Sequence, residues 1–273
     1  MMSVCADRWL VRPFRGCWHG PMFVDVDNTK LYYEDEGAGP VLLLLHGWAT
    51  SGRVWGAQLP EFVATHRVVT LDWRGCGRSD RPAHGNTLDG VLADLVAVIE
   101  RLDLDRPTVV GSSIGGSFAT ELAVCHPELI SAAVSVDGPA FWPSTGMPLA
   151  QLRSDLRDDR AGTFAGWVPR WFAPGVEPAL VDWTVRQMLD SGVYIDEHFD
   201  GCLTYDPRPV LPGLMAPIHY IHGELDTEIP VAVAEECAAL TPGASVAVIP
   251  GAGHMPHQEN PAAFNAALRK FLS

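Results

Sequence analysis

Short apolar runs alternate with helix-like patterns along the first half of the chain. Four of these runs are nearly continuous, as in strands that are covered on both faces of a sheet: Val41–Leu45, Val68–Leu71, Thr108–Val110 and Ala132–Val136. Before the third run, apolar residues recur at three- and four-residue spacing from Leu88 to Leu102, which marks one apolar face of a helix. This alternation predicts a doubly wound α/β fold with a mostly parallel sheet.

The same pattern returns near the end of the chain. Ile218–Ile221 and Ser245–Ile249 are predicted strands with a helix, Val231–Leu240, between them, and Asn260 is predicted to cap a helix that begins at Pro261. Residues 138–212 differ, because they are rich in aromatic residues, are interrupted by prolines and contain no clear strand. We therefore predict an α/β core of residues 22–137 and 213–273, with residues 138–212 inserted as a helical cap or lid.

Composition and charge narrow the function classes. A formal net charge of -14 repels phosphate backbones and anionic lipid heads, so we expect a small-molecule substrate, no nucleic acid and no membrane partner. The six cysteines have neither CxxC spacing nor a Cys/His cluster, so we predict no metal site and free thiols in a cytoplasmic protein. Residues 1–21 lack the apolar run of a signal peptide and are predicted to be a flexible extension or an upstream start.

The sharpest chemical signal is the segment GSSIG at 111–115, which fits the G-x-S-x-G pattern with Ser113 as the nucleophile. It follows a predicted strand and precedes a helical stretch, Ser117–Cys125, and this strand–turn–helix context is the one that the pattern requires. A tight turn would expose the hydroxyl at a helix N-terminus, where N–H groups favour developing negative charge. Ser112 is the weaker candidate, because the positions two residues away on either side of it are not glycine.

A serine nucleophile needs a base and an orienting carboxylate. His254 follows the predicted strand Ser245–Ile249 in the segment GAGH, and Asp226 follows Ile218–Ile221, so the chain order is Ser…Asp…His, as in the α/β-hydrolase arrangement. Asp137 also ends a predicted strand and stays open as the alternative acid.

Acyl transfer also needs hydrogen-bond donors for the oxyanion and walls for the substrate. The segment His46-Gly47-Trp48 follows a strand, so the backbone N–H groups of Trp48 and Ile114 are the predicted oxyanion donors. Phe141 and Trp142, which come soon after the strand that ends at position 136, are predicted to form a pocket wall together with Trp48.

With these motifs in order, the chain resembles the α/β-hydrolase family. The stretches that carry the resemblance are HGWATSGRVW (46–55), LDWRGCGRSDRP (71–82), GSSIGG (111–116), HGELDTEIP (222–230) and GAGHMPHQENP (251–261). The resemblance is greatest to esterases, enol-lactonases and cofactor-free haloperoxidase-type perhydrolases, and it implies a lid over the serine and no metal or organic cofactor. It also implies structural roles near the active site for Asp72, Arg74, Gly77, Ser79, Glu259 and Pro261.

The expected activity is hydrolysis of an ester or lactone of a small, largely apolar molecule through an acyl-enzyme. C–C bond hydrolysis, perhydrolysis or another tailoring reaction could use the same three residues, so these stay open as alternatives. A ligand sensor with little turnover is the alternative from another class of protein, and an intact triad disfavours a purely non-catalytic scaffold.

Overall fold

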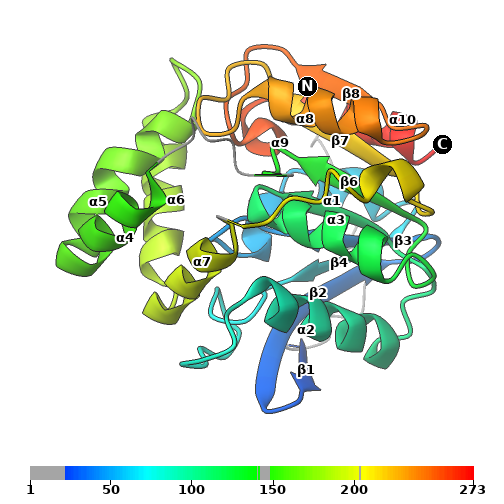
Figure 1. Cartoon of the computed structure of the whole chain (residues 1–273), viewed down its shortest axis with the longest axis horizontal. Helices are drawn as coiled ribbons and strands as arrows, with labels where there is room; N and C mark the ends of the chain where they lie inside the picture. The colour runs from blue at the N-terminus through cyan, green and yellow to red at the C-terminus, as the bar shows by residue number, and fades with distance from the viewer. Residues whose placement is uncertain (1–21, 140, 142–147, 203) are drawn as a thin grey trace, which may run out of the picture.

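The computed structural model describes residues 22–139, 141, 148–202 and 204–273. Its centre is an eight-stranded sheet in the order β1-β2-β4-β3-β5-β6-β7-β8 (Figure 1). The strands β3 (Val41–Leu45), β4 (Arg67–Leu71), β5 (Thr108–Ser112), β6 (Ala132–Val136), β7 (Ile218–Gly223) and β8 (Val246–Ile249) run parallel to one another. The predicted doubly wound, mostly parallel α/β fold is confirmed.

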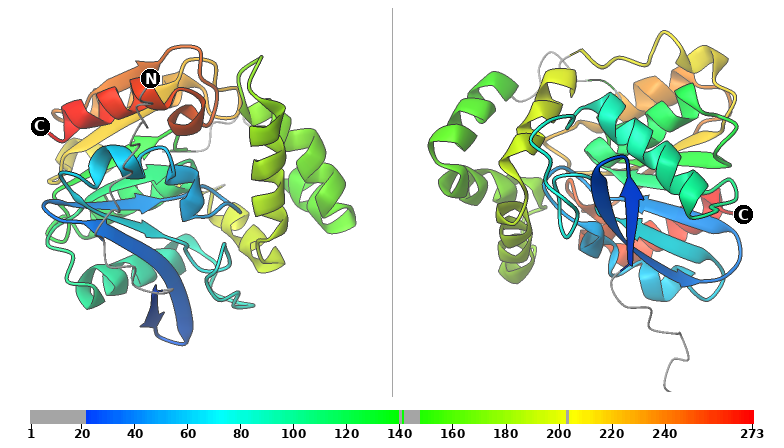
Figure 2. Two further views of the ribbon diagram at one scale, coloured as in Figure 1. Left: turned by 180° about the vertical axis from the view of Figure 1, so that it is seen from behind. Right: turned by 90° about the horizontal axis from the view of Figure 1, so that it is seen from below.

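Helices cover both faces of this sheet and explain its apolar strands. Figure 1 is viewed onto α2 (Leu88–Arg101), α3 (Ile114–Cys125) and α8 (Val231–Leu240), and the left view of Figure 2 onto α1 (Leu59–Phe62), α9 (Pro256–Glu259) and α10 (Pro261–Phe271). Every residue of β3 is buried, as a strand between two helical layers requires. The Asn260 side chain accepts a hydrogen bond from the N–H of Ala263, so the predicted cap of α10 is confirmed.

Two features differ from the sequence prediction. The chain begins its described part with a hairpin of β1 (Met22–Val26) and β2 (Thr29–Gly37), whose pairings with each other and with β4 are antiparallel. The helix α3 begins at Ile114, three residues before the predicted start. Two glycines in its first turn weaken the helical pattern in the sequence, and they are needed there because neighbouring strands pack too closely for a Cβ.

The chain between β6 and β7 forms an inserted helical segment, here called the insertion. Its helices are α4 (Leu149–Asp158), α5 (Arg160–Trp167), α6 (Pro178–Leu189) and α7 (His198–Cys202), with 3-10 turns η2 (Val168–Trp171) and η3 (Val193–Glu197) and, before β7, η4 (Leu211–Gly213). Figure 1 shows α4, α5 and α6 as a group at one side of the sheet. Over the described stretches, no helix is both long enough and apolar enough to cross a membrane.

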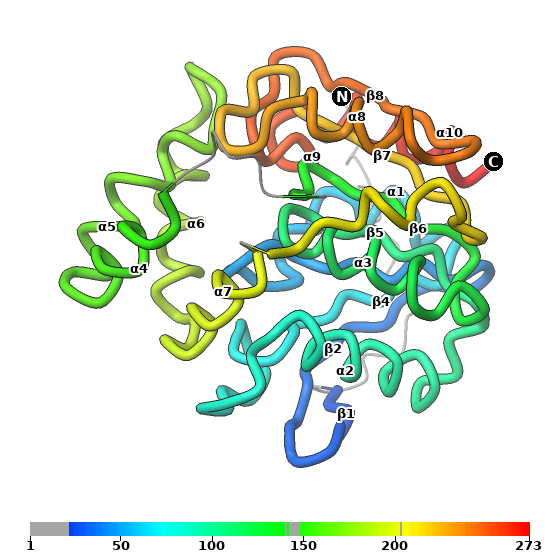
Figure 3. Tube along the Cα trace, viewed as in Figure 1, coloured from blue at the N-terminus to red at the C-terminus, as the bar shows by residue number. Residues whose placement is uncertain are grey.

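The trace in Figure 3 shows the strands of the sheet lying side by side. Parallel strands end at one edge of a sheet, and the segments after β3, β5, β7 and β8 carry Trp48, Ser113, Asp226 and His254. We therefore expect the functional site at the carboxyl edge of the sheet, where doubly wound sheets bind their ligands.

Candidate active site

Ser113 lies at the turn between β5 and α3 in a backbone conformation that L-residues rarely adopt, with φ 52° and ψ -124°. The turn requires glycine at its flanks, because a Cβ on Gly111 would lie 1.9 Å from the carbonyl oxygen of Gly115. The N–H of Ser113 donates to the carbonyl of Val136 on the neighbouring strand at 2.8 Å. The turn is thus held on one side by its own glycines and on the other by β6. Ser112, the weaker candidate, is fully buried.

Ser113, His254 and Asp226 form one hydrogen-bonded row. His254 Nε2 lies 3.0 Å from Ser113 Oγ, and His254 Nδ1 lies 2.7 Å from Asp226 Oδ2. Asp226 is oriented by the N–H groups of Glu228 and Ile229, which donate to its Oδ1 at 2.8 and 3.0 Å. The structure therefore brings together the three side chains that were predicted from separate motifs, in an order that can pass a proton from hydroxyl to imidazole.

The charges in this row reinforce one another. Burial pushes the pKa of Asp226 upward, but the positive charge of His254 and hydrogen bonds from His222 and His254 outweigh burial and hold that pKa below its ordinary value. Burial alone would lower the pKa of His254, whereas the charge and hydrogen bond of Asp226 raise it. The carboxylate is thus kept ionised, and the imidazolium that would form during proton transfer is stabilised.

Asp137, the alternative acid, lies behind this row rather than in it. It is fully buried at the end of β6, and its Oδ1 accepts a hydrogen bond from the N–H of Gly223 at 2.8 Å and lies 3.6 Å from His222 Nε2. Burial first, and the neighbouring charge of Asp226 second, raise the pKa of Asp137 well above its ordinary value. These shifts favour the neutral form at Asp137 and the ionised form at Asp226.

Asp137, His222 and Asp226 also place one ligand-type atom each within 4.8 Å of the others. However, His222 Nε2, which lies 3.4 Å from Asp226 Oδ2, is also only 2.8 Å from the carbonyl oxygen of Ile229. A ring nitrogen that donates to a carbonyl carries a proton and cannot at the same time bind a metal. We interpret the cluster as a buried hydrogen-bond network that supports Asp226.

Glu259 holds the loop that carries His254. Its Oε1 accepts hydrogen bonds from the N–H groups of Gly253 and Met255, both at 3.0 Å, and its Oε2 accepts one from Ala173 of the insertion at 2.7 Å. The N–H of His254 itself donates to the carbonyl of Trp171 at 2.6 Å. The backbone of His254 is therefore fixed by both the core and the insertion.

Asp72 holds the loop after β4 in a similar way, by accepting hydrogen bonds from backbone N–H groups. Its two carboxylate oxygens accept from the N–H of Gly52 at 2.6 Å and from the N–H of Arg78 at 2.9 Å, and Ser79 donates to its carbonyl. Arg74 forms an ion pair with the buried Asp94, with Nε 2.6 Å from Oδ2. These contacts agree with the structural roles that the family resemblance implies.

The predicted oxyanion donors flank Ser113. A Cβ on Gly47 would lie 3.3 Å from Ser113 Cβ, so the loop that carries Trp48 passes directly beside the nucleophile turn. Ile114 is the first residue of α3, where an N–H has no carbonyl partner within its own helix. The N–H of Trp48 donates no hydrogen bond within the described part of the chain. Both groups are therefore available to a ligand oxygen.

A small pocket opens onto this row. Its walls come from the core and from the insertion: Ser113, Ile114, Pro139, Trp167, Trp171, Phe199, Cys202, Glu228, Ile229 and His254. Trp48 and Phe141, which were predicted as pocket wall, do not line this pocket. The Trp48 indole packs against Phe199 with ring centroids 4.6 Å apart, and Phe141 lies beneath the guanidinium of Arg208. Trp142 lies outside the described residues.

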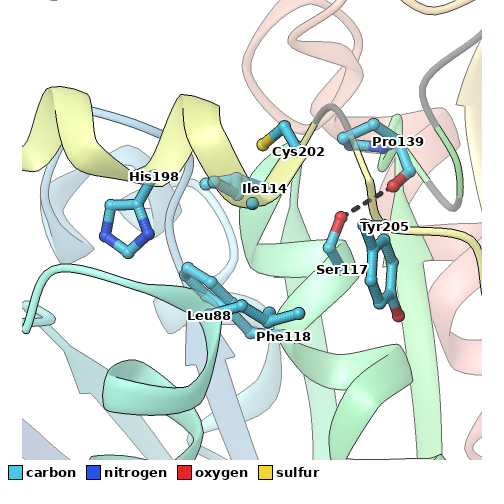
Figure 4. A pocket seen from close by; sticks show the side chains of 9 residues that line it. Leu88, Ile114, Ser117, Phe118, Pro139, His198, Cys202 and Tyr205 are labelled. Carbon is cyan, nitrogen blue, oxygen red and sulfur yellow. Dashed lines mark hydrogen bonds between the residues drawn. The ribbon is translucent and has the colours of Figure 1, made fainter.

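A second small cavity, whose lining Figure 4 shows, adjoins the first. Ile114, Pro139 and Cys202 line both cavities, and His198, Phe118 and Tyr205 are among the residues that line the second one alone. Burial lowers the pKa of His198 to about 3, so its imidazole is neutral. The second cavity therefore offers apolar surface and neutral polar groups rather than charge.

A doubly wound sheet that carries a hydroxyl–imidazole–carboxylate row at its carboxyl edge is characteristic of the α/β hydrolases. The chain belongs to this family, because the model described as "Alpha/beta hydrolase family" matches residues 42–267. The sequence match and the fold together establish the family, and the esterase relatives support a hydrolase.

The chain is similar to proteins that are named for different activities. The chain is 31% identical to a pimeloyl-[acyl-carrier protein] methyl ester esterase of Edwardsiella ictaluri, over 89% of this chain and 97% of the relative. It is 29% identical to a non-heme haloperoxidase of Rhodococcus erythropolis, over 92% and 99% of the two chains. An esterase structure from Exiguobacterium antarcticum superposes with a TM-score of 0.86 at 26% identity, covering 93% of this chain and 99% of that one.

Proposed function

We propose that this protein is a serine hydrolase that cleaves an ester or lactone of a small, largely apolar molecule through an acyl-enzyme. The observation that carries the proposal is the continuous row from Ser113 Oγ through His254 to Asp226, with its 3.0 and 2.7 Å separations. The esterase relatives support the same reaction class.

In the proposed mechanism, Ser113 Oγ attacks the carbonyl carbon while His254 Nε2 takes the hydroxyl proton. The N–H groups of Trp48 and Ile114 donate to the oxyanion of the tetrahedral intermediate. When the intermediate collapses, the bond to the alcohol oxygen breaks, and His254 returns its proton to the leaving alcohol. Water then attacks the acyl-enzyme with His254 again as the base, which restores Ser113.

The insertion serves as the lid in this proposal. Trp167, Trp171 and Phe199 from the insertion close the pocket over Ser113, so an apolar acyl or alcohol group would be enclosed by aromatic walls. Burial of apolar substrate surface contributes about 25 cal/mol per Å². This favours small substrates that place apolar groups against these walls.

We also propose a cytoplasmic location. The described cysteines Cys76, Cys125, Cys202 and Cys237 all have free thiols. Free thiols are typical of proteins that work in a reducing compartment.

A fluorophosphonate probe tests the nucleophile directly. We expect the probe to label Ser113, because it reacts with hydroxyls that an adjacent base activates. Peptide mapping by mass spectrometry should place the adduct on residue 113, and hydrolysis of a nitrophenyl ester should stop in proportion to labelling. An adduct confined to Ser112, or labelling without loss of hydrolysis, would contradict the proposal.

The pH dependence of hydrolysis tests the base. His254 must be neutral to accept a proton, and the carboxylate of Asp226 raises its pKa above the ordinary value of 6.5. We therefore expect kcat/KM for a neutral ester to be low in acid and to rise with a midpoint above pH 6.5. Initial rates between pH 5 and 9, corrected for spontaneous hydrolysis, measure this midpoint. A midpoint clearly below 6.5 would show that His254 is not the titrating base in this environment.

A further inference from the structure

Glu228 places a carboxylate in the wall of the pocket that contains Ser113 and His254. The side chain is only 5% exposed. Its Oε2 accepts a hydrogen bond from Trp167 Nε1 at 2.9 Å, whereas its Oε1 is buried and has no hydrogen-bond partner within the described part of the chain. One oxygen of this pocket-lining residue thus accepts no hydrogen bond from the described part of the chain.

A neighbouring cation accounts for this oxygen only in part. Arg170 Nη2 lies 3.6 Å from Oε1 and forms an ion pair with it without a hydrogen bond, and the Arg170 side chain is 64% exposed, so water screens its charge. A buried carboxylate without full pairing is costly, because an acceptor that loses water without gaining a hydrogen bond is destabilising. Anchoring Trp167 of the insertion explains Oε2 but leaves Oε1 unexplained. Such a group in a pocket indicates a partner that arrives with the ligand.

The surroundings of Glu228 favour a cation as that partner. Trp167 and Trp171 line the same pocket with ring centroids 5.0 Å apart at an interplanar angle of 86°, so they present aromatic surface beside the carboxylate. Aromatic faces attract cations, and the formal net charge of -14 favours the approach of positively charged molecules. The adjoining cavity of Figure 4, with its neutral His198, suits an uncharged part of a ligand instead.

We propose that Glu228 is a specificity-determining residue that binds a protonated amino group, so that the preferred substrates are esters or lactones that carry an ammonium group. This inference rests on the proposed serine hydrolase function and names the substrate class of the same pocket. The ammonium group donates to Oε1, while the scissile carbonyl lies at Ser113 and the remaining apolar part contacts the tryptophans.

The first experiment compares matched nitrophenyl esters of hexanoic, 6-hydroxyhexanoic and 6-ammoniohexanoic acid. A charge-assisted hydrogen bond is worth ~1.5–3 kcal/mol, so we expect kcat/KM for the ammonium ester to exceed that for the hexanoate by about tenfold or more. In Glu228→Gln this ratio should fall towards one, because the amide keeps the shape and the acceptor for Trp167 but loses the charge. Glu177→Gln removes an exposed carboxylate from the insertion and should keep the wild-type ratio.

The three esters distinguish failure of the ammonium site from failure of the proposed serine hydrolase function. A ratio near one in the wild type, or a ratio that survives Glu228→Gln, overturns the ammonium proposal while leaving serine hydrolysis intact. An equal preference for the hydroxyl ester overturns it as well, because a neutral donor would then suffice. If none of the three esters is cleaved, the proposed function fails instead.

A binding measurement tests the ammonium site without turnover. Protonated n-butylamine should quench or shift the fluorescence of the pocket tryptophans in the wild type, with n-butanol as the uncharged control. We expect Glu228→Gln to weaken binding of the amine by about tenfold, in line with a charge-assisted hydrogen bond. Equal binding of the amine to wild type and variant overturns the proposal whatever the esterase assays show.

Discussion

Replacing Ser113 by alanine should abolish ester hydrolysis, with a loss of roughly 10⁴-fold or more in kcat. The hydroxyl supplies the atom that forms the acyl-enzyme, and no other side chain lies at the 3.0 Å position beside His254 Nε2 in the described structure. The fold should survive, because alanine keeps the strained backbone of the turn and removes a single oxygen. Steady-state rates on a short-chain nitrophenyl ester, with thermal unfolding of both proteins, measure the two effects.

Ser112→Ala is the matched control for this variant. Ser112 is adjacent in sequence, but its hydroxyl is buried and has no hydrogen-bond partner in the described part of the structure. Removing it should leave hydrolysis close to that of the wild type. Full activity in Ser113→Ala, or a specific loss in Ser112→Ala with unchanged unfolding, would mean that the nucleophile has been assigned to the wrong residue.

Much of the fold was predictable because buried parallel strands have a distinctive pattern. A strand such as Val41–Leu45, covered on both faces, must be apolar at every position, and that run stands out from any helix or loop. The hairpin β1–β2 was not predicted, because β2 has the sequence TKLYYEDEG and lies towards the sheet edge, where polar residues are tolerated. Its register depends on pairing with β4, which is distant in sequence.

The three residues of the row were predictable for a related reason. Each follows a recognisable strand, and the topology carries the ends of parallel strands to one edge of the sheet. The residues of the pocket walls could not be predicted in this way, because they depend on how the insertion packs against that edge. Trp167 and Glu228 meet across 61 positions of sequence, and no local pattern records this contact. The one available signal was an acidic residue directly before the apolar Ile229-Pro230 of the same loop.

The sequence offered two candidates, Asp226 and Asp137, for the acid that orients His254, and the two side chains have different surroundings in the structure. Asp226 touches His254 at 2.7 Å and accepts two backbone N–H groups, whereas Asp137 accepts one and lies behind His222. Two carboxyl groups this close cannot both ionise cheaply, so the field that favours the anion at Asp226 favours the neutral acid at Asp137. A neutral acid cannot stabilise an imidazolium by charge.

This difference predicts unequal effects of the same chemical change at the two positions. Asp226→Asn removes the charge that stabilises protonated His254 and should lower kcat by ~10³–10⁴-fold. Asp137→Asn replaces a neutral group by another of the same shape, and the amide oxygen can still accept from the N–H of Gly223. We expect a loss of about tenfold at most in this second variant, from small shifts of the network behind Asp226.

Rates on one nitrophenyl ester, measured for both asparagine variants over a range of pH, distinguish the roles. Loss of the Asp226 charge should also move the midpoint of the residual activity to lower pH, because that charge is what raises the pKa of His254. Asp137→Asn should leave the midpoint nearly unchanged, since burial and the charge of Asp226 raise the pKa of Asp137 and so favour its uncharged form. A greater loss of kcat in Asp137→Asn than in Asp226→Asn, at equal thermal stability, would mean that Asp137 and not Asp226 is the orienting acid.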